Sequence, residues 1–178
     1  MRLLRDLGSI VVTLLLLGEL QAQQAPKMPK EAAEVLQYLE GEWQVSGRIG
    51  NDKITGTFTA RAVPGRYALI TRDSQVFKGE TIRRVGVLGW DPAEERLRHF
   101  GFSEDNEIFL NHWNVNEAGE WIGEISGTQK GEKFSAAFKI TKKTNGFIFE
   151  SEDEGEEIIY TKKEKKKEQE PRKKEKLQ

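Results

Sequence analysis

From residue 41 to residue 162, hydrophobic and polar residues alternate in short segments. Apolar residues or glycine occupy every second position in 54–60 and 134–140, and a similar alternation runs through 82–90. A period of two places successive side chains on opposite faces of an extended chain, so each segment predicts a β-strand. Nine short sequences rich in Gly, Asn, Asp and Pro separate such segments, which predicts about ten strands.

The connections between these strands are too short for the crossovers that parallel strands need, so an antiparallel sheet is expected. An open sheet of many strands leaves two edges exposed, and closure into a barrel removes both. We therefore predict an all-β, up-and-down antiparallel β-barrel, with a β-sandwich of the same strands as the alternative. Glycines inside the strands fit the bends that a small barrel requires. They are Gly47, Gly56, Gly86, Gly89, Gly101, Gly123 and Gly127.

A different spacing precedes the first strand. In the segment 30–40 the apolar residues recur at the i, i+3, i+4 and i+7 positions that share one side of an α-helix. They are Ala32, Val35, Leu36 and Leu39. Gly41 follows and ends this periodicity. We expect one short N-terminal helix whose apolar side covers an end of the barrel.

The N-terminal residues have the layout of a secretory signal peptide. Arg2 and Arg5 precede an apolar run, and small residues follow it. The run, residues 7–17, is far shorter than the roughly 20 residues that span a bilayer, so a retained membrane anchor is the less favoured alternative. We predict cleavage after Ala22, with Ala25 as a second candidate. The protein is then exported, periplasmic or secreted, and has no transmembrane segment after cleavage.

Four parts follow from these patterns. Residues 1–22 are the predicted signal peptide, and 23–30 form a polar linker with two prolines. Residues 31–162 form the barrel domain. Residues 163–178 are a Lys/Glu-rich tail with almost no apolar residue, which we expect to be disordered.

Charge is distributed unevenly between the domain and the tail. From Lys162 onward nine basic residues stand against four acidic ones, whereas the residues between the signal peptide and Lys162 include 17 basic and 23 acidic. Phosphate binding needs a basic face, so we expect no nucleic-acid partner for this acidic domain. Two roles remain open for the basic tail: contact with an anionic membrane or cell-wall surface, or solubility alone.

The residues 41–43, Gly-Glu-Trp, stand where the predicted helix meets the first strand. They resemble the Gly-x-Trp motif that opens the first strand of lipocalins and related calycins. Together with Val-Leu-Gly-Trp-Asp-Pro at 87–92 and the segment 147–153, they resemble an uncharacterised bacterial lipocalin-like domain of exported proteins. The resemblance covers roughly residues 32–162.

This resemblance implies an up-and-down barrel with a small cup that binds a small apolar molecule. It also implies that Gly41 and Trp43 close one end of the barrel. The chain departs from the usual lipocalin pattern at a late strand, where the Trp of a typical lipocalin packs against an Arg. The last predicted strand here offers only Lys162 and Lys163 for that position.

Several kinds of chemistry are missing from the sequence. The chain has no cysteine, which removes disulfides, thiolate nucleophiles and thiolate metal sites. It contains no Gly-x-x-x-x-Gly-Lys phosphate loop, no Gly-x-Ser-x-Gly elbow and no His-Glu-x-x-His motif. We therefore expect no cofactor, no metal site and none of the common hydrolase or nucleotide-dependent activities.

Five residues are candidate ligand contacts. Arg72 and Arg84 lie within strands, where a buried guanidinium needs an anionic partner such as a ligand carboxylate. His99 and His112 fall on neighbouring predicted strands. If they face each other, the two imidazoles can hold a zinc ion together with a carboxylate, or one of them can act as a general base. Neither histidine stands in a metal-ligand motif. Trp113 is a candidate wall of the cup. The alternatives are solvent-facing arginines, structural or surface histidines and a core tryptophan.

Three functions fit these observations. The first is an exported protein that binds a small apolar molecule in its barrel. The second is an enzyme of the isomerase or cyclase type, with a cup lined by His99, His112 and Arg84. The third is a structural or interaction module with a packed barrel. Cavity volume separates them, because a small-molecule pocket usually encloses roughly 300 Å³ or more.

Overall fold

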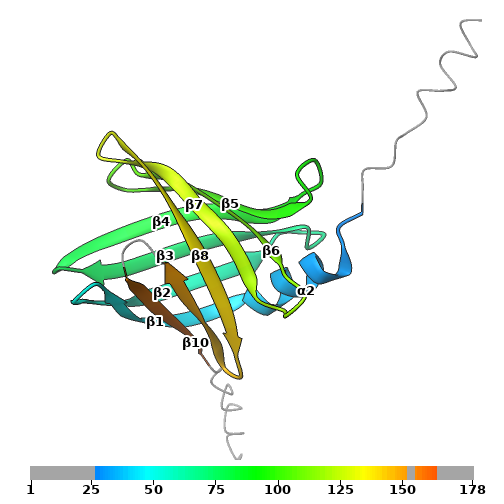
Figure 1. Cartoon of the computed structure of the whole chain (residues 1–178), viewed down its shortest axis with the longest axis horizontal. Helices are drawn as coiled ribbons and strands as arrows, with labels where there is room; N and C mark the ends of the chain where they lie inside the picture. Colours follow the sequence, from blue (N-terminus) through cyan, green and yellow to red (C-terminus); the bar gives the residue numbers. More distant parts are fainter. Residues whose placement is uncertain (1–26, 152–154, 164–178) are drawn as a thin grey trace, which may run out of the picture.

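The computed structural model describes residues 27–151 and 155–163. Within them, ten antiparallel strands form a closed barrel, with one helix at its end (Figure 1). Each strand pairs with the next along the chain, and β1 pairs with β10, which confirms the up-and-down barrel and excludes the sandwich. The elements are α2 (Lys30–Leu39), β1 (Gly41–Ile49), β2 (Asp52–Ala62), β3 (Ala68–Phe77), β4 (Glu80–Asp91), β5 (Arg96–Ser103), β6 (Ile108–Val115), β7 (Trp121–Gln129), β8 (Glu132–Lys143), β9 (Gly146–Ser151) and β10 (Glu156–Lys162).

The ends of the chain are outside this description. The predicted signal peptide, residues 1–22, and the linker up to residue 26 lie outside the described residues, as does the tail from residue 164. Their roles stay predictions. Within the described residues, no helix combines the length and the apolar character that crossing a membrane requires.

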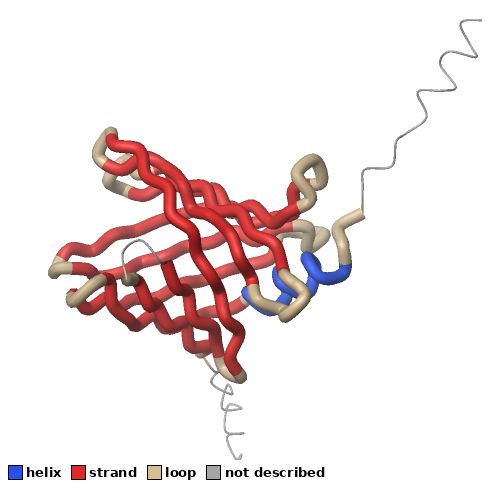
Figure 2. The backbone as a smooth tube through the Cα atoms, viewed as in Figure 1, coloured by secondary structure: helices blue, strands red, loops and turns tan. Residues whose placement is uncertain are grey.

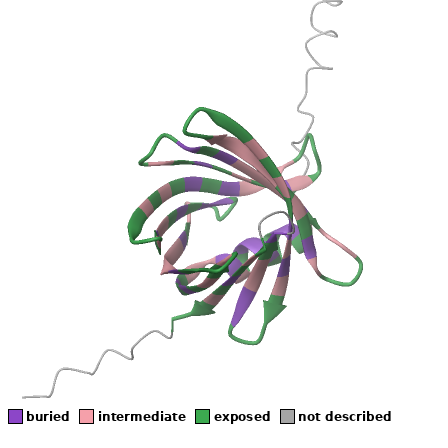
Figure 3. Cartoon of the chain, turned by 60° about the vertical axis from the view of Figure 1, so that its left-hand side comes forward, coloured by how far each residue is buried: buried purple, intermediate pink, exposed green. Residues whose placement is uncertain are grey.

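Alternation along each strand sends one set of side chains into the barrel. On β2, Ile54 and Ala60 are buried while the threonines between them are less so, as the two-residue period predicts. Leu88 of β4 and Phe138 of β8 are buried in the same way. Long strands and short turns dominate the backbone (Figure 2), and buried and exposed bands alternate along the strands (Figure 3). The core therefore lies inside the barrel.

Helix α2 closes one end of the barrel, and its predicted apolar stripe is the side that packs inward. All four stripe residues are buried: Ala32, Val35, Leu36 and Leu39. Trp43 of β1 joins the helix to the barrel, because its indole Nε1 donates a hydrogen bond to the Leu39 carbonyl oxygen at 2.9 Å. The Tyr38 hydroxyl donates to the Gly146 carbonyl oxygen at 2.5 Å, which ties the helix to β9 as well.

Gly41 and Lys162 meet where the helix passes into β1. Gly41 has a φ of 144°, which side chains disfavour, and a Cβ there would lie 3.0 Å from Lys162 Cε. The Lys162 ammonium lies 5.0 Å from the centre of the Trp43 ring. A lysine of the last strand thus covers the tryptophan at the closed end of the barrel.

Candidate functional site

The barrel holds a partly open cavity of about 200 Å³, lined mostly by inward side chains of the strands. Apolar side chains surround it toward α2, among them Leu39, Leu88 and Trp113. Polar side chains line the opposite end, away from the helix. The volume is below the 300 Å³ expected of drug-sized ligands but above the 150 Å³ of an engineered cavity that binds benzene. The barrel is therefore not packed solid, and its cavity suits a very small molecule.

A charged cluster forms the polar end of the cavity. Arg84 of β4 stands opposite Asp73 of β3 in the strand register, and Arg84 NH1 lies 3.5 Å from Asp73 Oδ2. Arg84 Nε donates to Glu107 Oε2 at 2.9 Å. The Asp73 and Glu107 side chains are only 14% and 7% exposed. Two carboxylates therefore share one guanidinium. The cluster of Asp73, Arg84 and Glu107 carries an excess negative charge when both carboxylates are ionised.

The protonation of this cluster reflects burial first and ion pairing second. Burial raises the pKa of Asp73 from 3.8 to about 6, although Arg84 opposes the rise. Burial opposes the charge on Arg84, but the Glu107 and Asp73 carboxylates outweigh it and raise the Arg84 pKa. Arg84 therefore stays charged, while Asp73 changes charge within the range where many proteins work.

Two buried oxygens of the cavity wall have no hydrogen-bond partner among the described residues. They are Oδ1 of Asp73 and Oδ1 of Asn111, and the indole Nε1 of Trp113 in the same wall is a buried donor that also lacks a partner among the described residues. A buried acceptor without a donor costs about 1 to 3 kcal/mol, so such atoms are rare unless something outside the chain satisfies them. Both oxygens belong to the lining of the same cavity. A bound molecule with N–H or O–H groups would supply the missing donors.

His99 of β5 also lines the cavity, and its partner is Thr71 of β3. His99 Nε2 and Thr71 Oγ1 lie 2.7 Å apart, reaching across Gly86 of the strand between them. The imidazole also meets the Phe109 ring edge to face, with 5.1 Å between ring centres. Burial lowers the pKa of His99 from 6.5 to about 4, so the ring is neutral near pH 7.

Tyr160 of β10 faces the same polar end. Its ring stacks on Phe147, with 4.3 Å between ring centres, and meets Phe58 edge to face. Burial raises the pKa of the Tyr160 phenol, and the nearby Asp73 carboxylate adds to the rise. The hydroxyl therefore keeps its proton.

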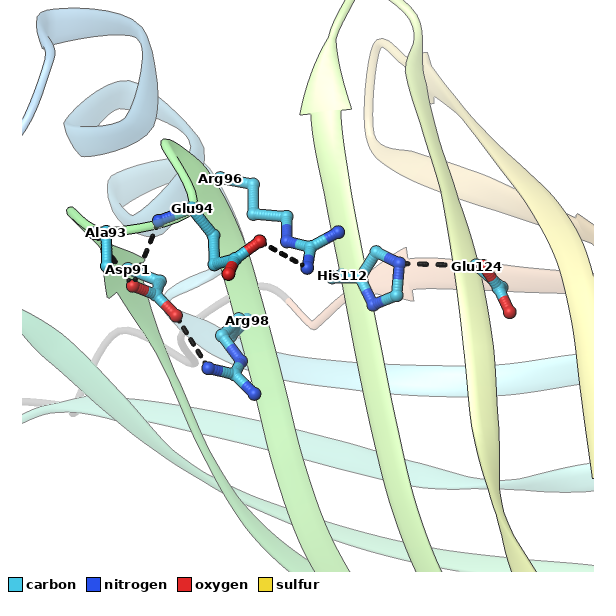
Figure 4. A network of polar contacts seen from close by, with 7 residues as sticks. All are labelled: Asp91, Ala93, Glu94, Arg96, Arg98, His112 and Glu124. Carbon is cyan, nitrogen blue, oxygen red and sulfur yellow. Dashed lines mark hydrogen bonds and ion pairs between the residues drawn. The ribbon is translucent and has the colours of Figure 1, made fainter. Parts of the chain in front are cut away.

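Two of the five sequence-predicted contacts lie on the outer face of the barrel. Arg72 is exposed. His112 lies on the outer wall with its Nε2 3.7 Å from Glu124 Oε2, beside the ion pairs that Arg96 and Arg98 make with the β4–β5 turn (Figure 4). Burial and the nearby Arg96 lower the pKa of His112. Neither Arg72 nor His112 lines the cavity.

The two histidines therefore do not face each other. The register pairs His99 with Asn111 and His112 with Arg98, so the imidazoles point to opposite faces of the sheet. The hypothesis that the two imidazoles share a zinc ion is wrong for this geometry. Within residues 27–151 and 155–163, no group of three His, Asp or Glu side chains is placed to hold a metal ion.

Trp113 is both a core residue and a cavity wall. It is 4% exposed, meets Phe138 edge to face and lines the cavity. Arg84, His99 and Trp113 are thus the three sequence-predicted contacts that the fold brings together. Sequence reasoning missed the polar groups Asp73, Glu107, Asn111 and Tyr160. The two-residue period places Asp73 on the face of the buried Leu69 and Thr71, which was a usable signal for one of them.

Neither the family models nor the curated proteins searched include a match to this chain.

Proposed function

We propose that this protein binds a small, mainly apolar molecule inside its barrel. The observation that carries the proposal is the cavity inside the barrel, which has apolar walls and unsatisfied buried acceptors at one end. Ligand pockets commonly combine apolar walls with a few polar groups that orient the ligand. The helix covers one end, so a ligand enters from the end that holds the charged cluster.

The cavity volume limits the ligand to a molecule not much larger than benzene or indole. Long-chain lipids are too large for it. Together with the signal peptide expected at residues 1–22, this favours a role outside the cytoplasm in holding a small organic molecule.

The experiment that tests this proposal is a titration of the full chain with indole, followed by calorimetry. Saturable binding with one site is expected. The matched variants are Ile125→Phe, which fills the cavity, and Ile122→Phe, which adds the same group on the exposed outer face of β7. The first should weaken binding at least tenfold and the second should leave it unchanged. Absence of saturable binding, or equal affinity of both variants, contradicts the proposal.

An enzyme is the second candidate, because an ionisable carboxyl group with a pKa of about 6 lies beside a guanidinium in the cavity inside the barrel. Asp73 is then the base for a proton transfer, and Arg84 holds the Asp73 carboxylate in place. His112 takes no part, because it lies outside the barrel. Conversion of a bound ligand that Asp73→Asn abolishes, with binding retained, would favour this candidate over simple binding.

A further inference from the structure

We infer that the cavity selects a small amine, and we infer this from the charges and the unsatisfied oxygens at its polar end. The inference rests on the proposed binding function and names the head group of the ligand. The expected ligand has a compact aromatic or aliphatic body and a primary ammonium group that reaches Asp73.

The charges around Arg84 exclude the sequence-based hypothesis that Arg84 binds a carboxylate of the ligand. Arg84 is already engaged by Glu107 at 2.9 Å and by Asp73 at 3.5 Å. A third carboxylate would meet the two that are present, and like charges repel strongly where water is scarce. Arg84 therefore stabilises the acidic groups of the protein and is not free to bind an anionic ligand.

The remaining lining groups supply no positive charge. Among the described residues that line the cavity, Arg84 is the single side chain of Lys or Arg type. The two buried carboxylates Asp73 and Glu107 share it. His99 is held by Thr71 and is neutral near pH 7. The lining as a whole favours a cation.

The hydrogen-bonding pattern around Asp73 and Asn111 agrees with this conclusion. Asp73 Oδ1 and Asn111 Oδ1 are buried acceptors without a donor among the described residues, and the Trp113 indole Nε1 is a buried donor without an acceptor. An ammonium group carries three N–H donors and no acceptor, so it satisfies the two oxygens but not the Trp113 N–H, whereas a carboxylate only accepts and satisfies neither oxygen. A charge-assisted bond from an ammonium to Asp73 is stronger than a bond between neutral groups.

Aromatic side chains surround the rest of the cavity. Trp113, Phe138 and Phe109 line it, and the faces of such rings attract a cation while their area desolvates an apolar body. A small arylalkylamine therefore matches the volume, the walls and the polar end together.

The test is a titration of the full chain at pH 8 with three matched probes: 2-phenylethylamine, 2-phenylethanol and phenylacetate. Calorimetry measures each affinity. The amine should bind at least tenfold more tightly than the alcohol, and phenylacetate should not bind measurably. Asp73→Asn should bring the amine to within about threefold of the alcohol. Asp52→Asn makes the same chemical change at an exposed site outside the cavity and should leave the preference unchanged.

The outcomes separate this inference from the proposed function. Equal affinities for amine and alcohol, or tightest binding of phenylacetate, overturn the amine inference and leave small-molecule binding intact. If none of the probes binds and indole also fails, the proposed function is overturned together with the inference. The comparison of the three probes on the unchanged protein decides the matter even if Asp73→Asn does not fold.

Discussion

The hydroxyl of Thr71 and the imidazole Nε2 of His99 lie 2.7 Å apart across Gly86, although β4 separates their strands. The contact exists because Gly86 has no side chain to occupy the space between them. A Cβ at Gly86 would lie 2.8 Å from His99 Nε2 and 2.7 Å from the Phe100 carbonyl oxygen. One glycine thus lets two polar groups of the cavity wall satisfy each other.

Gly86→Ala should therefore destabilise the protein by about 1 to 3 kcal/mol, because the added methyl group collides with backbone as well as with the imidazole. Chemical denaturation measures the loss. Gly89→Ala, on the same strand, is the matched control, since its Cβ would meet neighbours at an ordinary 3.5 Å. Equal effects of the two substitutions would contradict the role given to Gly86.

The pH dependence of stability should reveal the buried carboxyl group of Asp73. Arg84, Gln75 and Glu107 face it, and Tyr160 lies nearby. The pKa of Asp73 rises from 3.8 to about 6 on folding, so folding disfavours the ionised form. Its contribution to stability is full below pH 4 and is lost as the pH rises through 6, by about 2 to 3 kcal/mol. Urea denaturation between pH 4 and 7 should show stability rising more steeply with pH in Asp73→Asn than in the unchanged protein. The same pH dependence in both would refute the raised pKa.

The contribution of His99 to stability should change with pH in the opposite direction to that of Asp73. The pKa of His99 falls from 6.5 to about 4 on folding, so folding favours the neutral ring. Its contribution is full above pH 6.5 and is lost as the pH falls through 4. His99→Gln keeps a polar group beside Thr71 but does not titrate, so it should remove this loss of stability in acid. Urea denaturation at pH 4.5 and 7 measures how much stability each protein loses in acid. If the His99→Gln variant loses as much as the unchanged protein, the result would argue against a neutral buried His99.

Trp43 and Trp113 should prove alike in stability and different in binding. Both are nearly fully buried, at 1% and 4% exposure, so truncating either to Ala should cost about 3 to 5 kcal/mol. Only Trp113 lines the cavity. Denaturation compares the two losses, and indole titration should show that Trp113→Ala changes the affinity while Trp43→Ala preserves it. Loss of binding in the Trp43 variant alone would reverse this assignment.

Lys162 should contribute modestly to the stability of the fold through the position of its ammonium over the Trp43 ring. Its ammonium also donates to the Tyr38 carbonyl oxygen at 3.4 Å, at the edge of α2. Lys162→Ala should cost about 0.5 to 1 kcal/mol, and Lys162→Arg should retain most of that stability. Lys163→Ala serves as the control because that side chain is exposed. Thermal or urea denaturation measures all three, and equal losses for the two alanine variants would remove the role of the cation over the tryptophan.

The sequence alone determined the class and closure of this fold. The two-residue period, the turn sequences and the in-strand glycines predicted ten antiparallel strands in a barrel, because such signals act within a few neighbouring residues. The apolar stripe of the helix and the Gly41-to-Trp43 junction predicted the closed end in the same local way. The position of Trp43 under the helix followed from that junction.

Only the tertiary structure decided which polar groups meet. The alternation of side chains along a strand defines two faces, but it does not tell which face is the inner one where both carry apolar residues. On β4, Val85 and Val87 are about half exposed on the outside, while Leu88 is buried inside. The pairing of Asp73 with Arg84, and the separation of His99 from His112, depend on register between strands that are distant in sequence. A shift of one residue would exchange the faces, so the cavity chemistry was fixed by packing across the whole barrel.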